Sequence, residues 1–230
     1  MELSNWLAIG AHADDVEIGM GATIKKETNR GRNVIICDLT EAERSSNGDV
    51  VTRKKEAGKA AEILGVSKRM NLRLPDRGLH LIDEYIMRIV TCIRKEKPEY
   101  VFAPYWVDRH PDHGNCAKLV KEAVFSAGIK KITDLQQLPA HKVKKMFYYM
   151  INSTEKPSLY VDVSETYAEK IEALKAYPSQ FIKSENSVDT PLTNGYIERV
   201  EARDRLNGFD AGTVFAEGFI TEQIYVTNHL

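Results

Sequence analysis

The sequence has few cysteines and no long hydrophobic run, and each absence excludes a class of protein. Three cysteines occur in 230 residues, at Cys37, Cys92 and Cys116, and none forms a C-x-x-C pair. An odd number at wide spacing argues against a disulfide framework and favours a reducing compartment. The N-terminus has no basic region before a long apolar segment, and no run approaches the ~18 apolar residues that span a bilayer. We therefore expect a cytoplasmic protein that does not enter membranes.

The sequence also lacks an excess of positive or negative charge. Lys and Arg number 32 and Asp and Glu 33, which gives a net charge of -1. This balance argues against a general nucleic-acid or acidic-membrane binder. An anionic small molecule remains possible as a substrate, but arginines close to the site would have to bind it.

The first half of the chain alternates between short apolar runs and segments of helical periodicity, which favours a parallel sheet with helices on both faces. With 43% apolar residues, the 230-residue chain fits a single domain. The pattern predicts strands at 6–9, 34–39, 69–74 and 100–103, separated by helices at 18–30, 52–64, 82–98 and 117–127.

The second half is less regular, and we expect a smaller α+β portion of the same domain, 1–230. No internal repeat or obvious linker occurs in it. The pattern predicts strands at 146–151 and 159–163, helices at 167–174 and 196–206, a loop at 178–191 and a β-like tail at 214–226.

Two polar clusters follow predicted strands. His12-Ala13-Asp14-Asp15 comes directly after the first strand, and Asp108-Arg109-His110-Pro111-Asp112-His113 follows the fourth. Ligands of open α/β sheets bind beyond the carboxyl ends of the strands, and strands one and four are commonly neighbours. We therefore expect the two loops to face each other.

Two histidines and a carboxylate form a typical catalytic zinc site. His12 and Asp15 lie three residues apart on a tight turn, and His113 could join them from the second loop. Asp14, His110 and Asp112 would then lie beside the metal without being ligands. A carboxylate beside a metal-activated water can act as a general base, and a histidine can stabilise an oxyanion or protonate an amine. These residues suit a metal-assisted hydrolase.

The run AHADDVEIGMGATI, followed by DRHPDH, resembles the LmbE/PIG-L family of zinc-dependent N-acetylglucosaminyl deacetylases. The resemblance extends to SSNG near residue 45, to Arg53 and Glu56, to TPLTNGY near 190 and to AEGF near 216. Within this family, the sequence is most similar to the deacetylases of bacillithiol biosynthesis, in the stretches DLTEAERSSNG, LPDRGL and FAPYWVDRHPDHGNCAKLV. The resemblance implies a Rossmann-like fold and removal of acetate from N-acetylglucosaminyl-malate.

The resemblance also implies a role for each matching residue. The zinc ligands would be His12, Asp15 and His113, and Asp14 would be the general base. His110 would stabilise the tetrahedral intermediate or protonate the amine, and Asp112 would orient His110. Arg53 and Tyr196 would contact the substrate. Fe²⁺ or Co²⁺ would suit the same ligands. Relatives are often hexamers, so a homo-oligomer is expected.

Arginines near the predicted loops support an anionic substrate independently of the resemblance. Malate carries two carboxylates, and the planar guanidinium group can hold a carboxylate with two hydrogen bonds. Arg53 and Arg109 lie beside the predicted active-site loops, and Arg77 lies in the turn after the third strand.

Three alternatives differ in substrate or in class. The same chemistry could act on another N-acetylglucosamine derivative or on a thiol S-conjugate amide. A non-catalytic metal- or sugar-binding module would not need Asp14 and His110 beside the metal. A nucleotide-dependent oxidoreductase is disfavoured because Gly19-Met20-Gly21 lacks the third glycine of the dinucleotide fingerprint.

Overall fold

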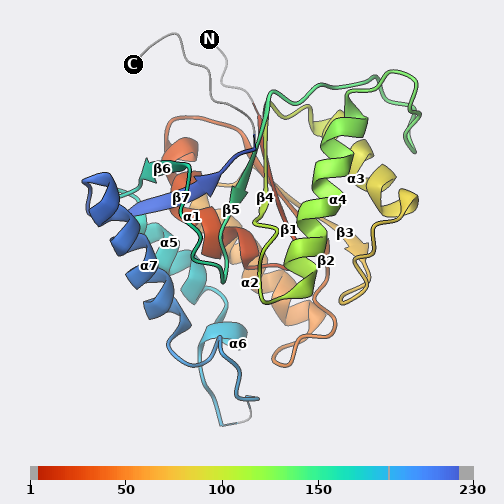
Figure 1. The fold of residues 1–230 in the computed structure, drawn as a ribbon. Coiled ribbons are helices and arrows are strands. Elements are labelled where there is room, and N and C mark those ends of the chain that lie inside the picture. Colours follow the sequence, from red (N-terminus) through yellow and green to blue (C-terminus); the bar gives the residue numbers. More distant parts are fainter. Residues whose placement is uncertain (1–4, 186, 223–230) are drawn as a thin grey trace.

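The computed structural model describes residues 5–185 and 187–222, and a seven-stranded sheet forms its centre (Figure 1). The strand order is β3-β2-β1-β4-β5-β7-β6. The first five strands are parallel, and β7 pairs antiparallel with both β5 and β6. The strands are β1 Trp6–Gly10, β2 Val34–Thr40, β3 Lys68–Leu74, β4 Tyr100–Pro104, β5 Lys145–Tyr149, β6 Leu159–Asp162 and β7 Ala216–Ile220.

Helices cover both faces of the sheet. The helices are α1 Asp15–Asn29, α2 Val50–Leu64, α3 Asp83–Glu96, α4 Pro111–Ala127, α5 Tyr167–Lys175, α6 Pro178–Phe181 and α7 Tyr196–Ala211. Apolar side chains of α3 and α4 form one core with the sheet, and those of α1, α2 and α5 form a second core on the opposite face. Figure 1 shows α3 and α4 together on one side and α5 and α7 on the other.

The predicted α/β class and its mostly parallel sheet are confirmed, but several boundaries differ, and α4 begins at Pro111 rather than at 117 while α7 ends at Ala211 rather than at 206. Helix α1 begins at Asp15, earlier than predicted, because Asp14 adopts a left-handed conformation with φ of 115° and turns the chain into the helix. The short helix α6, with Pro178 in its first turn, interrupts the predicted loop at 178–191. The predicted tail strand at 214–226 corresponds to β7 at Ala216–Ile220, and residues 223–226 of the prediction lie outside the described residues.

Helix α1 is broken at Met20, whose φ of -150° and ψ of 22° are not helical. Glycines at 19 and 21 flank the break. A Cβ atom on Gly19 would lie 2.0 Å from Cδ2 of Tyr149, so only glycine lets this ring pack against the helix. The Tyr149 hydroxyl donates a hydrogen bond of 2.8 Å to the carbonyl of Ile9 at the end of β1. Gly19 therefore serves packing between α1 and β5, whereas a Cβ atom on Gly21 would meet Lys170 of α5 at 3.3 Å.

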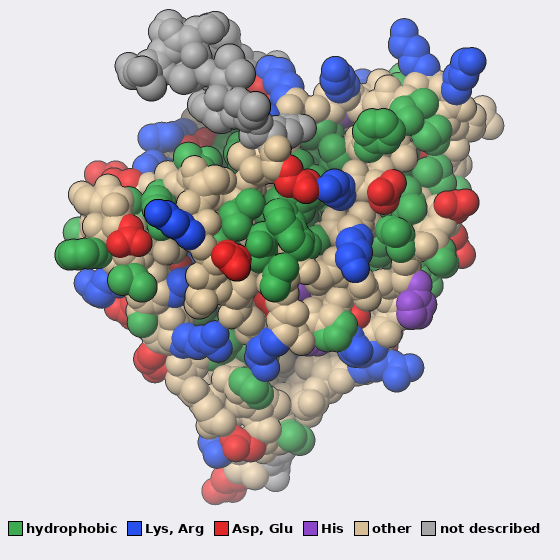
Figure 2. Space-filling model, viewed as in Figure 1, with side chains coloured by type: hydrophobic (Ala, Val, Ile, Leu, Met, Phe, Trp, Pro, Cys, Tyr) green, Lys and Arg blue, Asp and Glu red, His purple; other side chains and the backbone are tan. Residues whose placement is uncertain are grey.

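The outer surface carries both signs of charge. Figure 2 shows Lys, Arg, Asp and Glu side chains scattered among apolar ones on the face it presents. Among residues 5–185 and 187–222, no helix is long and apolar enough to cross a bilayer.

Candidate active site

The loops after β1 and β4 face each other, as the sequence predicts. Strand β1 pairs in parallel with both β2 and β4, so the carboxyl ends of these strands meet at one edge of the sheet. A pocket of about 270 Å³ opens there. Its wall brings together eight of the nine predicted site residues from distant parts of the chain, all except Asp112, namely His12, Asp14, Asp15, Arg53, Arg109, His110, His113 and Tyr196.

Asp15 lies between the two histidines that the sequence predicts as metal ligands. Its Oδ1 is 3.1 Å from Nε2 of His113, and its Oδ2 is 3.6 Å from Nδ1 of His12. The backbone N–H of His12 also donates to Oδ2 at 2.9 Å and fixes the carboxylate in the turn. All three side chains are buried. The Asp15 carboxylate therefore lies next to one nitrogen of each imidazole, with a different oxygen toward each ring.

The other nitrogen of each imidazole faces a second carboxylate. Nε2 of His12 lies 3.2 Å from Asp76 and 3.5 Å from Asp112, and Nδ1 of His113 lies 3.0 Å from Asp108. Carboxylates behind metal-binding histidines fix the ring orientation and raise the basicity of the ligand. Asp76, which follows β3, and Asp108, which is in the DRHPDH run, have no assigned role in the sequence prediction.

Among the described residues, two groups of side chains could each hold a divalent cation, and neither of them contains Asp15. One atom from each of His12, His110 and His113 lies within 4.8 Å of the others, and the same holds for His12, Asp76 and Asp112. Burial lowers the pKa of His113, but Asp15 and Asp108 outweigh burial and raise that pKa to about 9. The surrounding carboxylates thus favour positive charge at this place, and imidazole with carboxylate is the ligand chemistry that zinc and similar ions accept.

Asp14 lines the same pocket as the histidines and pairs with Arg53. Nη2 of Arg53 donates to Oδ2 of Asp14 at 3.0 Å and to the carbonyl of Ala13 at 2.6 Å, and both side chains are buried. Burial raises the pKa of Asp14 to about 7, although Arg53 opposes the rise. A carboxyl group with a pKa near neutrality suits proton transfer at physiological pH.

His110 is held by the backbone of its own loop. Its Nδ1 accepts a hydrogen bond of 3.3 Å from the N–H of Asp112, and its own N–H donates to Asp108. Burial, then the neighbouring His12 and His113, lower the pKa of His110 to about 4. Its ring is therefore neutral at physiological pH.

The Asp112 carboxylate is not directed at His110. It accepts hydrogen bonds from the N–H and the guanidinium of Arg77, at 2.8 and 3.0 Å, and its Oδ2 faces His12. The predicted link from Asp112 to His110 therefore runs through the backbone N–H, because the carboxylate supports a metal-ligand candidate instead.

The remaining predicted substrate residues, Arg109 and Tyr196, both line the pocket. Arg109 is exposed, and so is Arg44 of the loop between β2 and α2, which the sequence analysis did not single out. Tyr196 is buried, and its hydroxyl donates to Oδ1 of Asn152 at 3.0 Å. The side-chain amide of Asn152 in turn donates to Asp108 at 2.9 Å. Tyr196 is thus connected through Asn152 to Asp108, the carboxylate beside His113.

Comparison with known proteins agrees with the geometry. The model of the PIG-L family, GlcNAc-PI de-N-acetylase, matches residues 7–124. The chain belongs to this family. It is a metal-dependent hydrolase of N-acetyl amides, as the sequence predicts.

Three known proteins illustrate the family membership. Diacetylchitobiose deacetylase of Thermococcus kodakarensis is 38% identical over 189 residues, which cover 76% of this chain and 69% of the relative. A probable N-acetyl-alpha-D-glucosaminyl L-malate deacetylase 2 of Bacillus anthracis is 27% identical over 218 residues, covering 86% and 91%. The crystal structure of a conserved protein from Thermus thermophilus superposes with a TM-score of 0.89 at 33% identity, covering 99% and 100%.

Proposed function

We propose that this PIG-L family deacetylase acts on N-acetylglucosaminyl-malate in bacillithiol biosynthesis. The observation that carries the proposal is a pair of arginines at the pocket, Arg44 and Arg109. Both side chains are exposed, and neither has an ion-pair partner within residues 5–185 and 187–222. Arg53 and Arg77, by contrast, are held by Asp14 and Asp112. Two unpaired guanidinium groups suit the two carboxylates of malate.

The proposed metal is zinc, and the proposed ligands are Nδ1 of His12, the carboxylate of Asp15 and Nε2 of His113. When bound, the ion would polarise the acetyl carbonyl and lower the pKa of a water molecule to about 7. The carboxylates behind the two imidazoles would hold these ligands in place.

The residues around the metal ligands would carry the proton transfers. Asp14 takes a proton from the attacking water, and Arg53 holds its carboxylate in place. Because Nδ1 of His110 accepts a hydrogen bond from Asp112, the ring proton resides on Nε2, which donates toward the charge that develops on the carbonyl oxygen. Asp14 then gives this proton to the nitrogen, the C–N bond breaks, and the amine and acetate leave.

Arg53 remains a proposed substrate contact through one atom. Its Nε and Nη2 donate to Ala13 and Asp14, whereas its Nη1 lies at 3.4 Å from Oγ of Ser45. Because Nη1 donates one N–H to this hydroxyl, its second N–H is the donor left for the sugar or its aglycone.

The decisive experiment compares acetate release from N-acetylglucosaminyl-malate and from diacetylchitobiose, with metal-stripped and with zinc-restored protein. We expect zinc-dependent turnover with a preference for the malate compound. Arg44→Ala and Arg109→Ala should each lower kcat/KM on the malate compound roughly 10- to 100-fold, since a hydrogen bond to a charged group contributes about 1.5–3 kcal/mol.

The matched control is Arg30→Ala, an exposed arginine at the end of α1 that does not line the pocket. It should leave both substrates unaffected, and the two pocket variants should leave diacetylchitobiose turnover within about twofold. Equal losses on both substrates would contradict the proposed recognition of malate.

A second candidate substrate is diacetylchitobiose itself, favoured by the 38% identity to the Thermococcus kodakarensis enzyme. This alternative predicts faster turnover of the disaccharide than of the malate compound. It also predicts no selective loss in Arg44→Ala or Arg109→Ala, because a neutral sugar offers these guanidinium groups no carboxylate.

A further inference from the structure

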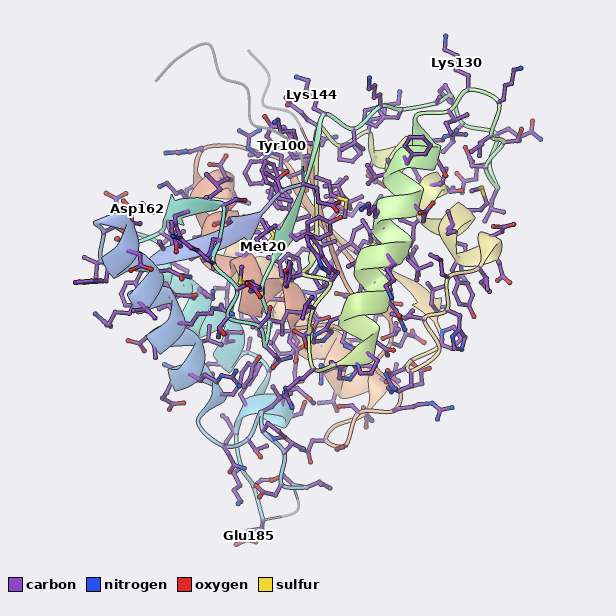
Figure 3. All side chains as sticks on the ribbon, in the orientation of Figure 1. Met20, Tyr100, Lys130, Lys144, Asp162 and Glu185 are labelled. Atoms are coloured by element: carbon purple, nitrogen blue, oxygen red, sulfur yellow. The ribbon has the colours of Figure 1, made fainter. Side chains whose placement is uncertain are left out.

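The break in α1 divides this helix into two unequal parts. The first part, 15–19, begins with Asp15 and carries Ile18, which lines the pocket. Met20, where the break occurs, is labelled in Figure 3, and its side chain is fully buried. A helical segment of five residues has no stability of its own, because nucleation of a helix is unfavourable. Something outside the helix must fix its direction.

Both helix ends created by the break are capped by side chains of the C-terminal part. The N–H groups of Ala22 and Thr23 donate to the carboxylate of Glu217 on β7, at 3.1 and 2.7 Å. The carbonyl of Ile18 accepts from Nη2 of Arg203 on α7 at 2.9 Å. An anion thus meets the free N–H groups and a cation meets the free carbonyl, which is the arrangement that the helix dipole favours.

The two capping side chains are the ends of one chain of three ion pairs, Arg203–Asp204–Lys170–Glu217, and both ends bind the backbone of α1; we call this set the capping ring. Nζ of Lys170 lies 2.6 Å from Asp204 and 2.6 Å from Glu217, and Nε of Arg203 lies 2.9 Å from Asp204. Lys170, Asp204 and Glu217 are fully buried. Two cations and two anions balance one another, so the ring is electrostatically complete.

Arg203 extends the ring toward the opposite side of the pocket. Its Nη1 donates to the carbonyls of Met150 and Ile151, at 2.8 and 3.2 Å. The next residue is Asn152, which holds Asp108. One guanidinium therefore joins the segment that carries Asp15 to the segment that supports His113.

From these contacts we infer that the capping ring positions Asp15 against His113, with Glu217 and Arg203 as the positioning residues. The inference rests on the proposed metal ligands and not on the identity of the sugar. Loss of the Glu217 charge would release the second part of α1 at its first turn and let the first part change direction. The metal ligands would then meet at a less favourable distance.

Metal affinity tests the inference directly. Glu217→Gln keeps the size of the side chain and removes its charge. Measured by competition with a chromophoric chelator, the Kd for zinc should rise at least about tenfold, the lower end of the effect of residues that support metal ligands. With cobalt in place of zinc, the visible absorption bands should shift because the ligand geometry changes.

Asp134→Asn is the matched control for lost stability. The side chain of Asp134 is as deeply buried as that of Glu217 and pairs with Arg94 at 2.9 Å, but it lies beyond α4 and contacts neither α1 nor the pocket. This variant should lower the free energy of unfolding while the zinc Kd and the cobalt bands stay as in the wild type. If both variants weaken zinc binding equally, the effect is one of general stability and the inference is wrong.

A second variant serves if Glu217→Gln does not fold. Arg203→Lys keeps the cation beside Asp204, but a lysine cannot bind Ile18, Met150 and Ile151 together. It should also raise the zinc Kd and shift the cobalt bands, and wild-type values in both measurements would overturn the inference. A chain that deacetylates neither sugar, yet whose Glu217→Gln variant binds zinc more weakly, would refute the proposed function and support the capping ring.

Discussion

Two groups of charged side chains lie inside this protein, one at the carboxyl ends of β1 and β4 and the other between α1, α5, α7 and β7. The second, the capping ring, has two cations for two anions and is complete. The first has an excess of carboxylates over permanent cations, with Asp14, Asp15, Asp76, Asp108 and Asp112 facing Arg53, Arg77 and three imidazoles. The difference indicates which group requires an ion from outside.

The largest expected effect comes from removing a ligand at the unbalanced group. His113→Ala should lose bound zinc and all measurable acetate release, and added zinc should not restore it. Zinc content measured by atomic absorption together with the acetate assay provides the check. His80→Ala, at an exposed histidine away from the pocket, should behave as the wild type. Full zinc content in His113→Ala would contradict the proposed ligand set.

Next in size is the loss of the general base. Asp14→Asn should lower kcat about 10²- to 10⁴-fold, the usual contribution of general acid–base catalysis, while the protein keeps its zinc. Single-turnover kinetics and metal analysis of the same sample would separate the two effects. Turnover at the wild-type rate would exclude Asp14 as the base and would leave it with a structural role only.

The balanced group should respond in stability. Lys170→Met leaves Asp204 and Glu217 buried without their cation, and removal of one partner of a buried pair costs about 3–5 kcal/mol of unfolding free energy. Urea denaturation measures the loss. Lys175→Met on the same helix breaks only an exposed pair with Glu172 and should cost no more than about 1 kcal/mol. Equal losses would show that burial does not distinguish the two lysines.

The smallest of these effects concerns a carboxylate that supports a ligand. Asp108→Asn retains the shape of the side chain beside Nδ1 of His113 but removes its charge. We expect zinc affinity to fall about 10- to 100-fold, as is typical when the partner of a metal-binding histidine is changed. Chelator competition provides the Kd, and a value equal to that of the wild type would reduce Asp108 to a loop-forming residue.

The fold and the place of the site follow from local patterns in the sequence. Alternating apolar runs and helical periods predict the parallel strands β1 to β4, and the polar runs after the first and fourth strands predict two facing loops. The same rule, that ligands gather at the carboxyl ends of strands, would have pointed to Asp76 after β3 and to Asn152 after β5. These two residues were missed because each is a single polar residue in a turn, where solvated side chains are common.

The capping ring could not be predicted in this way. Lys170, Asp204 and Glu217 lie on three elements that are separated in sequence, and each by itself suits an exposed position on a helix or strand. Their burial depends on how α5, α7 and β7 pack against α1, which no local pattern specifies. Nor does spacing show that Arg53 is held by Asp14, because that contact depends on the left-handed turn at Asp14.

The contact between Gly19 and Tyr149 has a consequence for the variation of this sequence among its relatives. The ring occupies the place of any side chain at position 19, and its hydroxyl holds the end of β1 just before the loop of His12. A larger residue at 19 can be accepted only if position 149 becomes smaller, and that exchange leaves the Ile9 carbonyl without its donor. Positions 19 and 149 should therefore change together in evolution. An engineered substitution at one of them should be combined with a compensating substitution at the other.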